Sequence, residues 1–362
     1  MKLTILREEL LRAVNSVGRL ATSRATLPIL QNIYLEVTKK QIRLHSTDLE
    51  QTLQIELAGN DLEVGALTVP ARLLGEYLQN NPDETVTLSN DDTTLLINSK
   101  NSKARLKGLP AEEYPTLPTI KYDSEITLAA ATLIEAVNKT LFAAALDETR
   151  PILTGLLFRF NEKSLTIVGT DGYRLAKYVL PIESQLSADY VIPRRTLQEL
   201  VRFSNEEEIT LAFSGSQVQL KTDGISLTSR IIDGSFPSYE AIIPKKTAVL
   251  VKMSAALLNQ NLKLASLFSR DSAYSTRIEA GGERFKITAV SPQLGETKNE
   301  IKLEMAVSQE FSVSLNAQYL IDALAGLNGD VEFGFVDPKS PITLHSVGHE
   351  NYLYLVMPLR SE

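Results

Sequence analysis

The sequence predicts an α+β protein built from three repeated domains. The main observation is an internal repeat, because residues 26–53 and residues 149–176 align without a gap at an offset of 123 and share seven identical residues. A third, more diverged copy is seen at residues 285–287 and 316–320. A repeat of this length sets the number of domains. We therefore expect domains at residues 1–122, 123–246 and 247–362.

The bulk composition agrees with several domains and excludes some kinds of chemistry. A chain of 362 residues is too long for one ordinary core. It has no cysteine, which excludes disulfides, thiolate metal sites and a cysteine nucleophile, and its three histidines lack metal-ligand spacing. We expect neither a metal site nor a cofactor. The net charge of −7 argues against a protein that coats nucleic acid, although a locally basic surface is compatible with it.

The first residues of the chain show no targeting segment. Residues 1–14 (MKLTILREELLRAV) carry charges inside their apolar run. This pattern predicts neither a signal peptide nor a membrane span. We expect a soluble, cytoplasmic protein.

Each repeat is expected to open with a short strand that passes into a helix. The strands are residues 2–6, 125–128 and 249–253, where apolar and polar residues alternate. Apolar residues at helical spacing follow each strand and mark the buried side of the helix. These stripes are Leu10, Leu11, Val14 and Val17; Leu133, Ile134, Val137 and Leu141; and Leu257, Leu258, Leu264 and Phe268.

A second helix is expected further along each repeat, at residues 72–79, 194–203 and 316–327. Its apolar residues are Leu73, Leu74, Tyr77 and Leu78 in the first repeat, and Leu197, Leu200 and Val201 in the second. Strands lie between and after the helices, and both helices should cover one sheet surface. The repeats could join edge to edge so that the sheet continues across their boundaries. An arc of three would leave a sheet edge open at each end, which head-to-tail dimerisation would remove.

Cations recur on the side of these helices opposite the apolar stripe. Five of the six helices have at least one, and the helix at residues 316–327 has none. In a single helix, a cation opposite the apolar stripe is also what an ordinary solvated face shows. Its recurrence from helix to helix favours a surface that binds phosphates. Such side chains contact phosphates without reading the base sequence. The cations are Arg12, Arg72, Lys139, Arg195, Arg202 and Lys263.

The segment Thr170-Asp171-Gly172-Tyr173-Arg174 has two interpretations. In the first, Asp171 is a base and Arg174 a clamp in a hydrolase. In the second, Asp171 and Gly172 form a tight turn, since Asp caps its own backbone and Gly tolerates positive φ. The first repeat keeps Thr47-Asp48 without the glycine. This favours the structural interpretation, and we expect no catalytic residues.

The end of the sequence, Tyr352–Arg360 (YLYLVMPLR), is apolar. A final core strand explains most of it, but Met357, Pro358 and Leu359 lie past the point where a strand should stop. Accessible Met and Leu side chains suit an adaptable groove for short peptides.

The triple repeat, the segments TDGYRLA and DGSFPSYEAIIP, and the terminal VMPLR together resemble the bacterial DNA polymerase III beta subunit, the sliding clamp family. The resemblance covers the whole chain. It implies three DNA-clamp domains per chain, closed by head-to-tail homodimerisation into a ring around double-stranded DNA. It also implies a non-catalytic processivity factor of DNA replication that tethers the replicative polymerase to its template.

The resemblance further implies a pocket, between the second and third domains, for a short apolar motif of the polymerase, the clamp loader and other partners. Filling it with a leucine-sized anchor would contribute ~1.5–3 kcal/mol per buried side chain. The matching residues are Leu153, Thr170, Gly172, Tyr173, Arg174, Leu175, Pro237, Ile242, Val356, Met357, Pro358, Leu359 and Arg360.

For DNA, the family positions that match are Arg24, Arg72, Arg150 and Arg195. For the dimer, the resemblance pairs the region of Arg105 and Leu106 in the first domain with Leu267 and Phe268 in the third. A scaffold that binds peptides but never DNA remains an alternative function.

Overall fold

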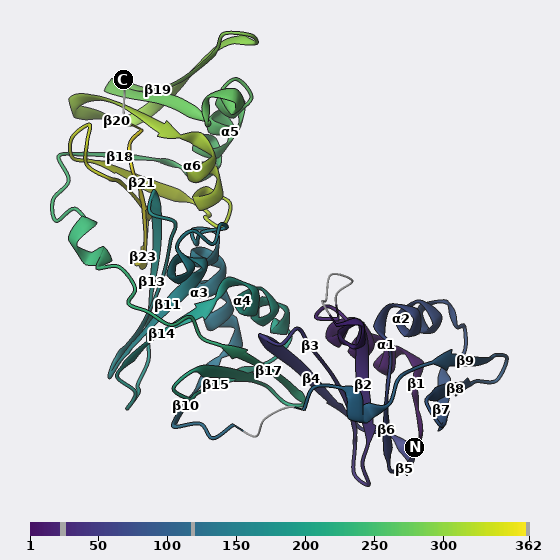
Figure 1. The fold of residues 1–362 in the computed structure, drawn as a ribbon. Helices are drawn as coiled ribbons and strands as arrows, with labels where there is room; N and C mark the ends of the chain where they lie inside the picture. The colour runs from purple at the N-terminus through teal and green to yellow at the C-terminus, as the bar shows by residue number, and fades with distance from the viewer. Residues whose placement is uncertain (22–26, 117–119, 360–362) are drawn as a thin grey trace. The chain divides into compact units, whose positions relative to one another are not determined.

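The computed structural model of the protein describes residues 1–21, 27–116 and 120–359 (Figure 1). Its contacts divide the chain into two compact units. The first contains Met1–Ala130 and Asn205–Ile231, and the second contains Ala131–Ser204 and Ile232–Glu362. This division does not follow the sequence repeats, because strands from neighbouring repeats pair in one sheet. The domain boundaries at residues 122 and 246 stay predictions.

The first unit begins with a five-stranded antiparallel sheet in the order β5-β1-β7-β8-β9. The opening strand of the chain lies between β5 and β7, and β9 forms an edge. The strands are β1 (Lys2–Leu6), β5 (Asn60–Glu63), β7 (Thr85–Asp91), β8 (Thr94–Asn98) and β9 (Lys103–Lys107).

An eight-stranded sheet in the order β10-β15-β16-β17-β4-β3-β2-β6 completes the first unit. The antiparallel pair of β4 and β17 joins the first repeat to the second, with Thr52 opposite Thr228. The sheet therefore continues across the repeat boundary, as expected from the sequence. The strands are β2 (Asn32–Val37), β3 (Ile42–Thr47), β4 (Gln51–Leu57), β6 (Gly65–Pro70), β10 (Ser124–Ala129), β15 (Glu208–Phe213), β16 (Gln217–Lys221) and β17 (Ile225–Arg230).

Helices α1 (Arg7–Val17) and α2 (Ala71–Asn80) pack against each other in the first unit (Figure 1). The predicted stripe of α1 is buried, and the helix ends at Val17, its last residue. In α2, Leu74 and Leu78 are buried but Leu73 is half exposed, so its assignment to the buried stripe is wrong. Two short 3₁₀ helices, η1 (Pro28–Gln31) and η2 (Ala111–Glu113), lie in the connections.

The second unit contains another eight-stranded antiparallel sheet, in the order β14-β11-β12-β13-β23-β22-β21-β18. Here β13 of the second repeat pairs with β23 of the third, with Leu175 opposite Leu355. The strands are β11 (Gly155–Asn161), β12 (Ser164–Thr170), β13 (Arg174–Pro181), β14 (Ala188–Pro193), β18 (Val249–Ser254), β21 (Asp330–Phe335), β22 (Ile342–Ser346) and β23 (His349–Val356).

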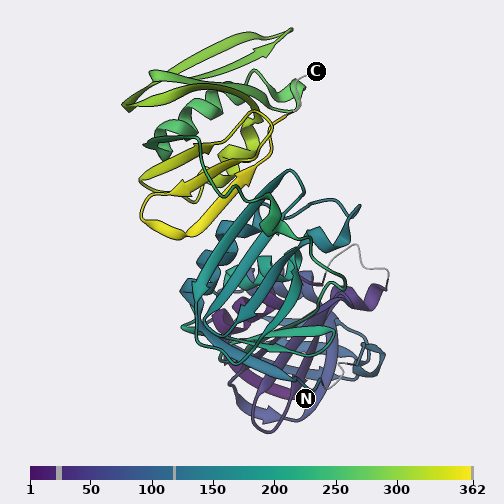
Figure 2. The same ribbon diagram turned by 90° about the vertical axis from the view of Figure 1, so that its left-hand side faces the viewer.

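A long hairpin of β19 (Ser275–Ser291) and β20 (Gly295–Asn316) covers helices α5 (Ala255–Ser266) and α6 (Ala317–Leu324). In Figure 2 the helices lie between this light-green hairpin and the yellow strands. The predicted stripe of α5 is wrong in part. Leu258 is buried, whereas Leu257 and Leu264 are nearly half exposed, because the helix turns Ala255, Leu262, Ala265 and Ser266 toward the core instead. The 3₁₀ helix η6 (Arg270–Ser272) follows α5.

The remaining helices belong to the second repeat. Helix α3 (Ala130–Leu141) buries its predicted stripe of Leu133, Ile134, Val137 and Leu141. The predicted helix at residues 194–203 is shorter than expected and ends in a 3₁₀ turn. These segments are α4 (Arg194–Leu200), η3 (Pro151–Thr154), η4 (Val201–Phe203) and η5 (Tyr239–Ile242). Among the described residues, no helix is long and apolar enough to cross a membrane.

Candidate peptide-binding pocket

The turn between β12 and β13 is held by its own side chains. Asp171 Oδ1 accepts hydrogen bonds from the backbone N–H groups of Tyr173 at 2.9 Å and Arg174 at 3.0 Å. Thr170 Oγ1 donates to the Arg174 carbonyl and accepts from the Gly172 N–H. Gly172 has φ +92°, a conformation that glycine adopts without steric cost. This arrangement confirms the structural interpretation of Asp171, whose carboxylate is occupied within the turn.

The first repeat builds the same turn between β3 and β4. Asp48 Oδ1 accepts from the N–H groups of Glu50 at 3.0 Å and Gln51 at 2.8 Å, and Thr47 Oγ1 donates to the Gln51 carbonyl. Leu49 takes the place of the glycine with φ 75°. The repeat that the sequence predicts is therefore present down to single hydrogen bonds.

Arg174 is buried and pairs with two carboxylates. Its Nε donates to Asp171 Oδ2 at 3.0 Å, and its Nη1 donates to Asp322 Oδ2 of α6 at 2.6 Å. The guanidinium also lies over the Tyr319 ring, 4.4 Å from its centroid. Burial by itself lowers the pKa of Arg174, but the hydrogen bond to Asp322 and the nearby carboxylates outweigh it, so the pKa is raised. Arg174 thus has the role of a structural cation that ties β13 to α6.

A cavity of about 150 Å³, which we call the apolar pocket, opens beside this turn. Its floor is apolar, because Leu175 of β13 and Leu355 of β23 are almost completely buried. Tyr173 is 66% exposed and stands at the rim. The lining residues are Arg150, Leu153, Thr170, Gly172, Tyr173, Arg174, Leu175, Pro237, Ser238, Tyr239, Ile242, Leu355 and Met357.

The end of the chain forms one side of the apolar pocket. Strand β23 ends at Val356, and the N–H of Met357 then donates to the carbonyl of Tyr173 at 2.8 Å. Leu359 donates to the carbonyl of Ser314 in β20 at 2.8 Å. The prediction that Met357, Pro358 and Leu359 lie past the final strand is confirmed. This places a flexible thioether on the lining without interrupting the sheet.

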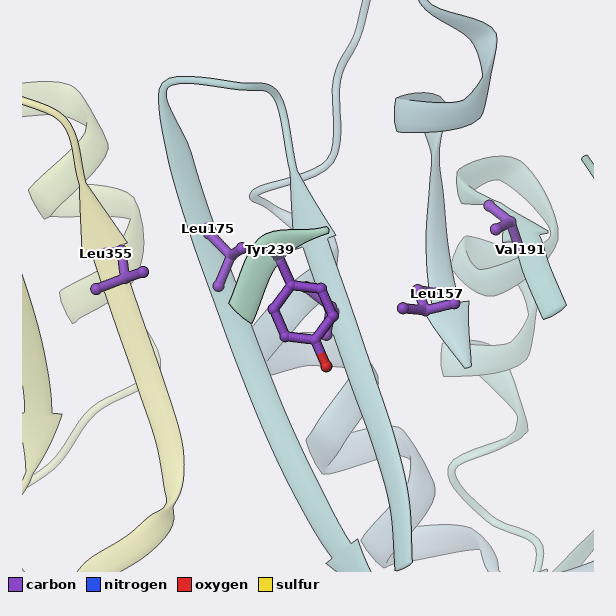
Figure 3. Close-up of a cluster of buried hydrophobic side chains, with 6 residues drawn as sticks. Leu157, Leu175, Val191, Tyr239 and Leu355 are labelled. Carbon is purple, nitrogen blue, oxygen red and sulfur yellow. The ribbon is translucent and has the colours of Figure 1, made fainter. Parts of the chain in front are cut away.

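The segment that contains η5 also lines the apolar pocket. Tyr239 is buried in a cluster with Leu157, Leu175, Val191 and Leu355, and Figure 3 shows its ring among them. Burial is the main reason that the pKa of Tyr239 rises to about 12, so its hydroxyl stays neutral.

Arg159 of β11 fastens this segment to the sheet. Its Nε and Nη2 donate to both carboxylate oxygens of Asp189 in β14, and its Nη1 pairs with Glu240 of η5. The guanidinium also lies 5.5 Å from the centroid of the Tyr239 ring. Arg159 therefore ties η5 and Tyr239, which line the apolar pocket, to strands β11 and β14.

The structure brings together most of the residues that the sequence predicts for this pocket. Val356 is buried in the sheet and, with Pro358 and Leu359, lies beside the lining, while Arg360 lies outside the described residues. Sequence reasoning missed Ser238, Tyr239 and Leu355. The sequence contains patterns that could have assigned two of them to the pocket. Tyr239 lies in the segment FPSYEAIIP, and Leu355 follows the core tyrosines of β23. Arg150 was predicted for DNA alone but also lines the pocket.

The other predicted DNA contacts differ in exposure. Arg12, Arg195 and Lys263 are exposed on α1, α4 and α5. The Arg72 side chain is 90% exposed and pairs with Glu76, and Arg202 pairs with Glu199. Arg24 lies outside the described residues.

The helical pattern predicts that Lys139 projects freely from α3. In the structure its side chain does not. Its side chain is 14% exposed, its ammonium pairs with Glu135 at 2.8 Å, and it lies over the rings of Tyr178 and Tyr352. The prediction that Lys139 lies on an outer helix face is therefore wrong. Strands β13 and β23 supply an aromatic surface for it that the helix pattern does not reveal.

The residues predicted for the dimer fall into two groups. Arg105 is exposed on the edge strand β9 and pairs with Asp91, but Leu106 is buried in its own domain. Leu267 is 49% exposed just after α5, next to the half-buried Phe268. A dimer contact could therefore use the Arg105 side chain, the backbone of β9 and the Leu267 side chain.

The class of protein that these features define has repeated α+β domains and a small apolar pocket at the end of the chain. Its Asp171 is structural, because the carboxylate is hydrogen-bonded within its own turn. Comparison with known families places it further. Residues 1–118, 127–238 and 240–360 match the N-terminal, central and C-terminal domains of the DNA polymerase III beta subunit.

Curated relatives and solved structures agree over the full length. The chain is 31% identical to the beta sliding clamp of Proteus mirabilis, which covers 99% of this chain and 100% of that protein. It is 28% identical to the Staphylococcus aureus beta sliding clamp, with 100% of both covered. The structure of the DNA polymerase III subunit beta from Pseudomonas aeruginosa matches with a TM-score of 0.95 at 29% identity, and the Bacillus subtilis sliding clamp with 0.94 at 27%, each with 100% of both chains covered.

The chain therefore belongs to the beta sliding clamp family, the DNA polymerase III beta subunits. It is a three-domain sliding clamp of DNA replication, a non-catalytic processivity subunit. The resemblance inferred from the sequence is confirmed, and so is the fold of repeated DNA-clamp domains.

Proposed function

We propose that this chain forms a head-to-tail homodimeric ring around double-stranded DNA in the cytoplasm and carries the replicative polymerase along it. Membership of the sliding clamp family over the whole chain supports this proposal. The open edge of β9 supports the dimer, because an unpaired edge strand offers its backbone N–H and C=O groups to a strand of another chain. The half-exposed Leu267 offers an apolar side chain that such a contact would bury.

The DNA contacts would be electrostatic and without sequence preference. Arg12, Arg72, Arg195, Arg202 and Lys263 are exposed cations on helices or helix ends, and such cations neutralise phosphates whatever the bases. Arg24 and Arg150 complete the proposed set. The net charge of −7 keeps nonspecific binding weak, which permits sliding.

The apolar pocket would hold the short motif of the polymerase, the clamp loader and other partners. The observation that carries this assignment is the lining itself. Leu153, Leu175 and Leu355 form a preformed apolar floor within 150 Å³, and Met357 adds an adaptable side. Apolar cavities with a few polar groups at the rim are typical of ligand sites. The proposed contact set also includes Pro358 and Leu359, which follow Met357 in the chain, together with Val356 and Arg360 from the resemblance.

Topology gives the decisive test of the ring. The protein is placed on nicked circular DNA with its clamp loader and ATP, and the DNA is then linearised. We expect retention on the circle and rapid loss after linearisation, since an encircled duplex leaves only through a free end. Retention on the linear DNA would overturn the ring. No retention on circles, with intact peptide binding, would support a peptide scaffold instead.

A further inference from the structure

A second cavity, which we call the polar pocket, lies in the first unit beside the repeated turn. Its volume is about 400 Å³. Apart from Leu49, Pro115, Ile120 and Tyr122, every lining residue has a polar or charged side chain. The lining residues are Thr47, Leu49, Glu50, Thr52, Gln54, Pro115, Thr116, Ile120, Tyr122, Gln217, Gln219, Ser226, Thr228, Ser229 and Arg230.

The polar pocket has the same backbone frame as the apolar pocket. Both start from a Thr-Asp turn with matching hydrogen bonds. The N–H of Arg230 donates to the carbonyl of Glu50 at 3.1 Å, just as the N–H of Met357 donates to that of Tyr173 at 2.8 Å. Strand β17 thus runs past β4 as β23 runs past β13.

The strand registers make the correspondence specific residue by residue. Thr52 lies opposite Thr228 where Leu175 lies opposite Leu355. Six lining positions of one pocket therefore match six of the other. In the order apolar to polar pocket, they are Thr170 and Thr47, Gly172 and Leu49, Tyr173 and Glu50, Leu175 and Thr52, Leu355 and Thr228, and Met357 and Arg230.

The side chains at these positions have the opposite character. Threonines replace the two buried leucines of the apolar pocket. Thr228 accepts a hydrogen bond from Gln219 Nε2 at 3.3 Å, and Thr52 donates one to Thr47 Oγ1 at 3.0 Å. Glu50 and Arg230 replace an aromatic ring and a thioether. An apolar anchor placed here would remove water from these hydroxyls and charges without replacing its hydrogen bonds.

We propose that Glu50, Thr52, Thr228 and Arg230, with Leu49 in place of the glycine, are specificity-determining residues. Their side chains close this second frame, which matches the first at six lining positions, to apolar segments. This inference rests on the proposed role of the apolar pocket. It explains, from side-chain polarity alone, how a chain with two such frames offers one site for an apolar motif.

The test measures binding stoichiometry by isothermal titration calorimetry, with a short leucine-anchored peptide as the probe. The wild-type chain should bind one equivalent, and Met357→Glu should weaken that site at least about tenfold. The exchange Leu49→Gly, Glu50→Tyr, Thr52→Leu, Thr228→Leu and Arg230→Met is then made in the Met357→Glu background. We expect the exchanged chain to regain one equivalent.

Each outcome bears on a separate claim. Two equivalents on the wild type, or none regained by an exchanged chain with a wild-type circular dichroism spectrum, would overturn the specificity proposal alone. No binding to the wild type would overturn the peptide role of the apolar pocket as well. If the full exchange does not fold, the pair Glu50→Tyr and Arg230→Met replaces it, because both residues are exposed. This pair should then raise peptide affinity in the Met357→Glu background, and unchanged affinity would contradict the proposal.

Discussion

Leu49 and Gly172 occupy the same position of two turns 123 residues apart, and both have positive φ, 75° and 92°. The surrounding hydrogen bonds of the two turns match. One turn therefore supports a left-handed backbone with a leucine, a conformation that costs an L-residue roughly 1–2 kcal/mol. Hydrogen bonds to the side chains of Thr47 and Asp48 hold the backbone of Leu49 in this conformation.

This relationship predicts that Gly172→Ala destabilises the protein by about 1 kcal/mol. The cause is conformational, because a Cβ at this position would meet only Arg150 Nη1, at 4.0 Å. Leu49→Gly should change stability by less, since relief of strain is offset by the larger entropy of glycine in the unfolded chain. Urea unfolding of both variants checks this, and an equal loss for both would contradict it.

Met357→Ala should weaken binding of a leucine-anchored peptide by about tenfold, or ~1.4 kcal/mol, because the lining loses a thioether that packs on the anchor. Fluorescence anisotropy with a labelled peptide gives the affinity. Met305→Ala is the matched control, since Met305 is 79% exposed on β20 and does not line the pocket. Equal effects of the two substitutions would exclude Met357 from the site.

Arg159→Met should weaken the same peptide several-fold although Arg159 does not line the apolar pocket. Without its ion pairs to Asp189 and Glu240, whose carboxylates are half exposed, η5 loses a tether worth about 1 kcal/mol, and Tyr239 is less firmly held. Arg43→Met is the control, because Arg43 also pairs with two carboxylates, Glu36 and Glu56, but in the other unit. Unchanged peptide affinity in Arg159→Met would show that the tether does not position the wall.

Protonation of His45 should make the protein less stable in acid. His45 is buried and stacked on Tyr34 at 4.4 Å between ring centroids, and burial lowers its pKa to about 4 from 6.5. Above pH 6.5 the histidine is neutral in both states, so stability is unaffected. Between pH 6.5 and 4 the unfolded chain binds the proton first, which removes up to about 3 kcal/mol from the free energy of unfolding.

His45→Phe tests this origin of the acid sensitivity, because it keeps the ring stack but not the titrating group. The free energy of unfolding of the variant, measured by urea denaturation at several pH values, should fall less steeply between pH 6.5 and 4 than that of the wild type. Parallel pH profiles for the two proteins would rule out His45 as the cause.

Leu267→Lys should shift the dimer toward monomer by at least about tenfold in dissociation constant, because a charged side chain would replace an apolar one in the contact. Analytical ultracentrifugation measures the change. Leu146→Lys is the control, since Leu146 is 77% exposed in the loop after α3. A dimer equally stable in both variants would move the interface away from Leu267.

The sequence by itself determined the repeat, the α+β class and the chemistry of the TDGYRLA turn. It could do so because these depend on local patterns, namely apolar periodicity and the capping preferences of Thr, Asp and Gly. It also separated the end of the chain from the final strand, since the segment Met357-Pro358-Leu359 cannot continue a ladder.

Only the tertiary structure decided which helix residues are free and which long-range partners meet. Leu257 and Leu264 have the spacing of core residues yet are exposed, and Lys139 has the spacing of a surface cation yet rests on two tyrosine rings. The tether from Arg159 to Glu240 and the frame shared by the two pockets join residues far apart in the chain. Such contacts follow from strand register and packing between elements, and helical or strand periodicity within one segment carries no information about them.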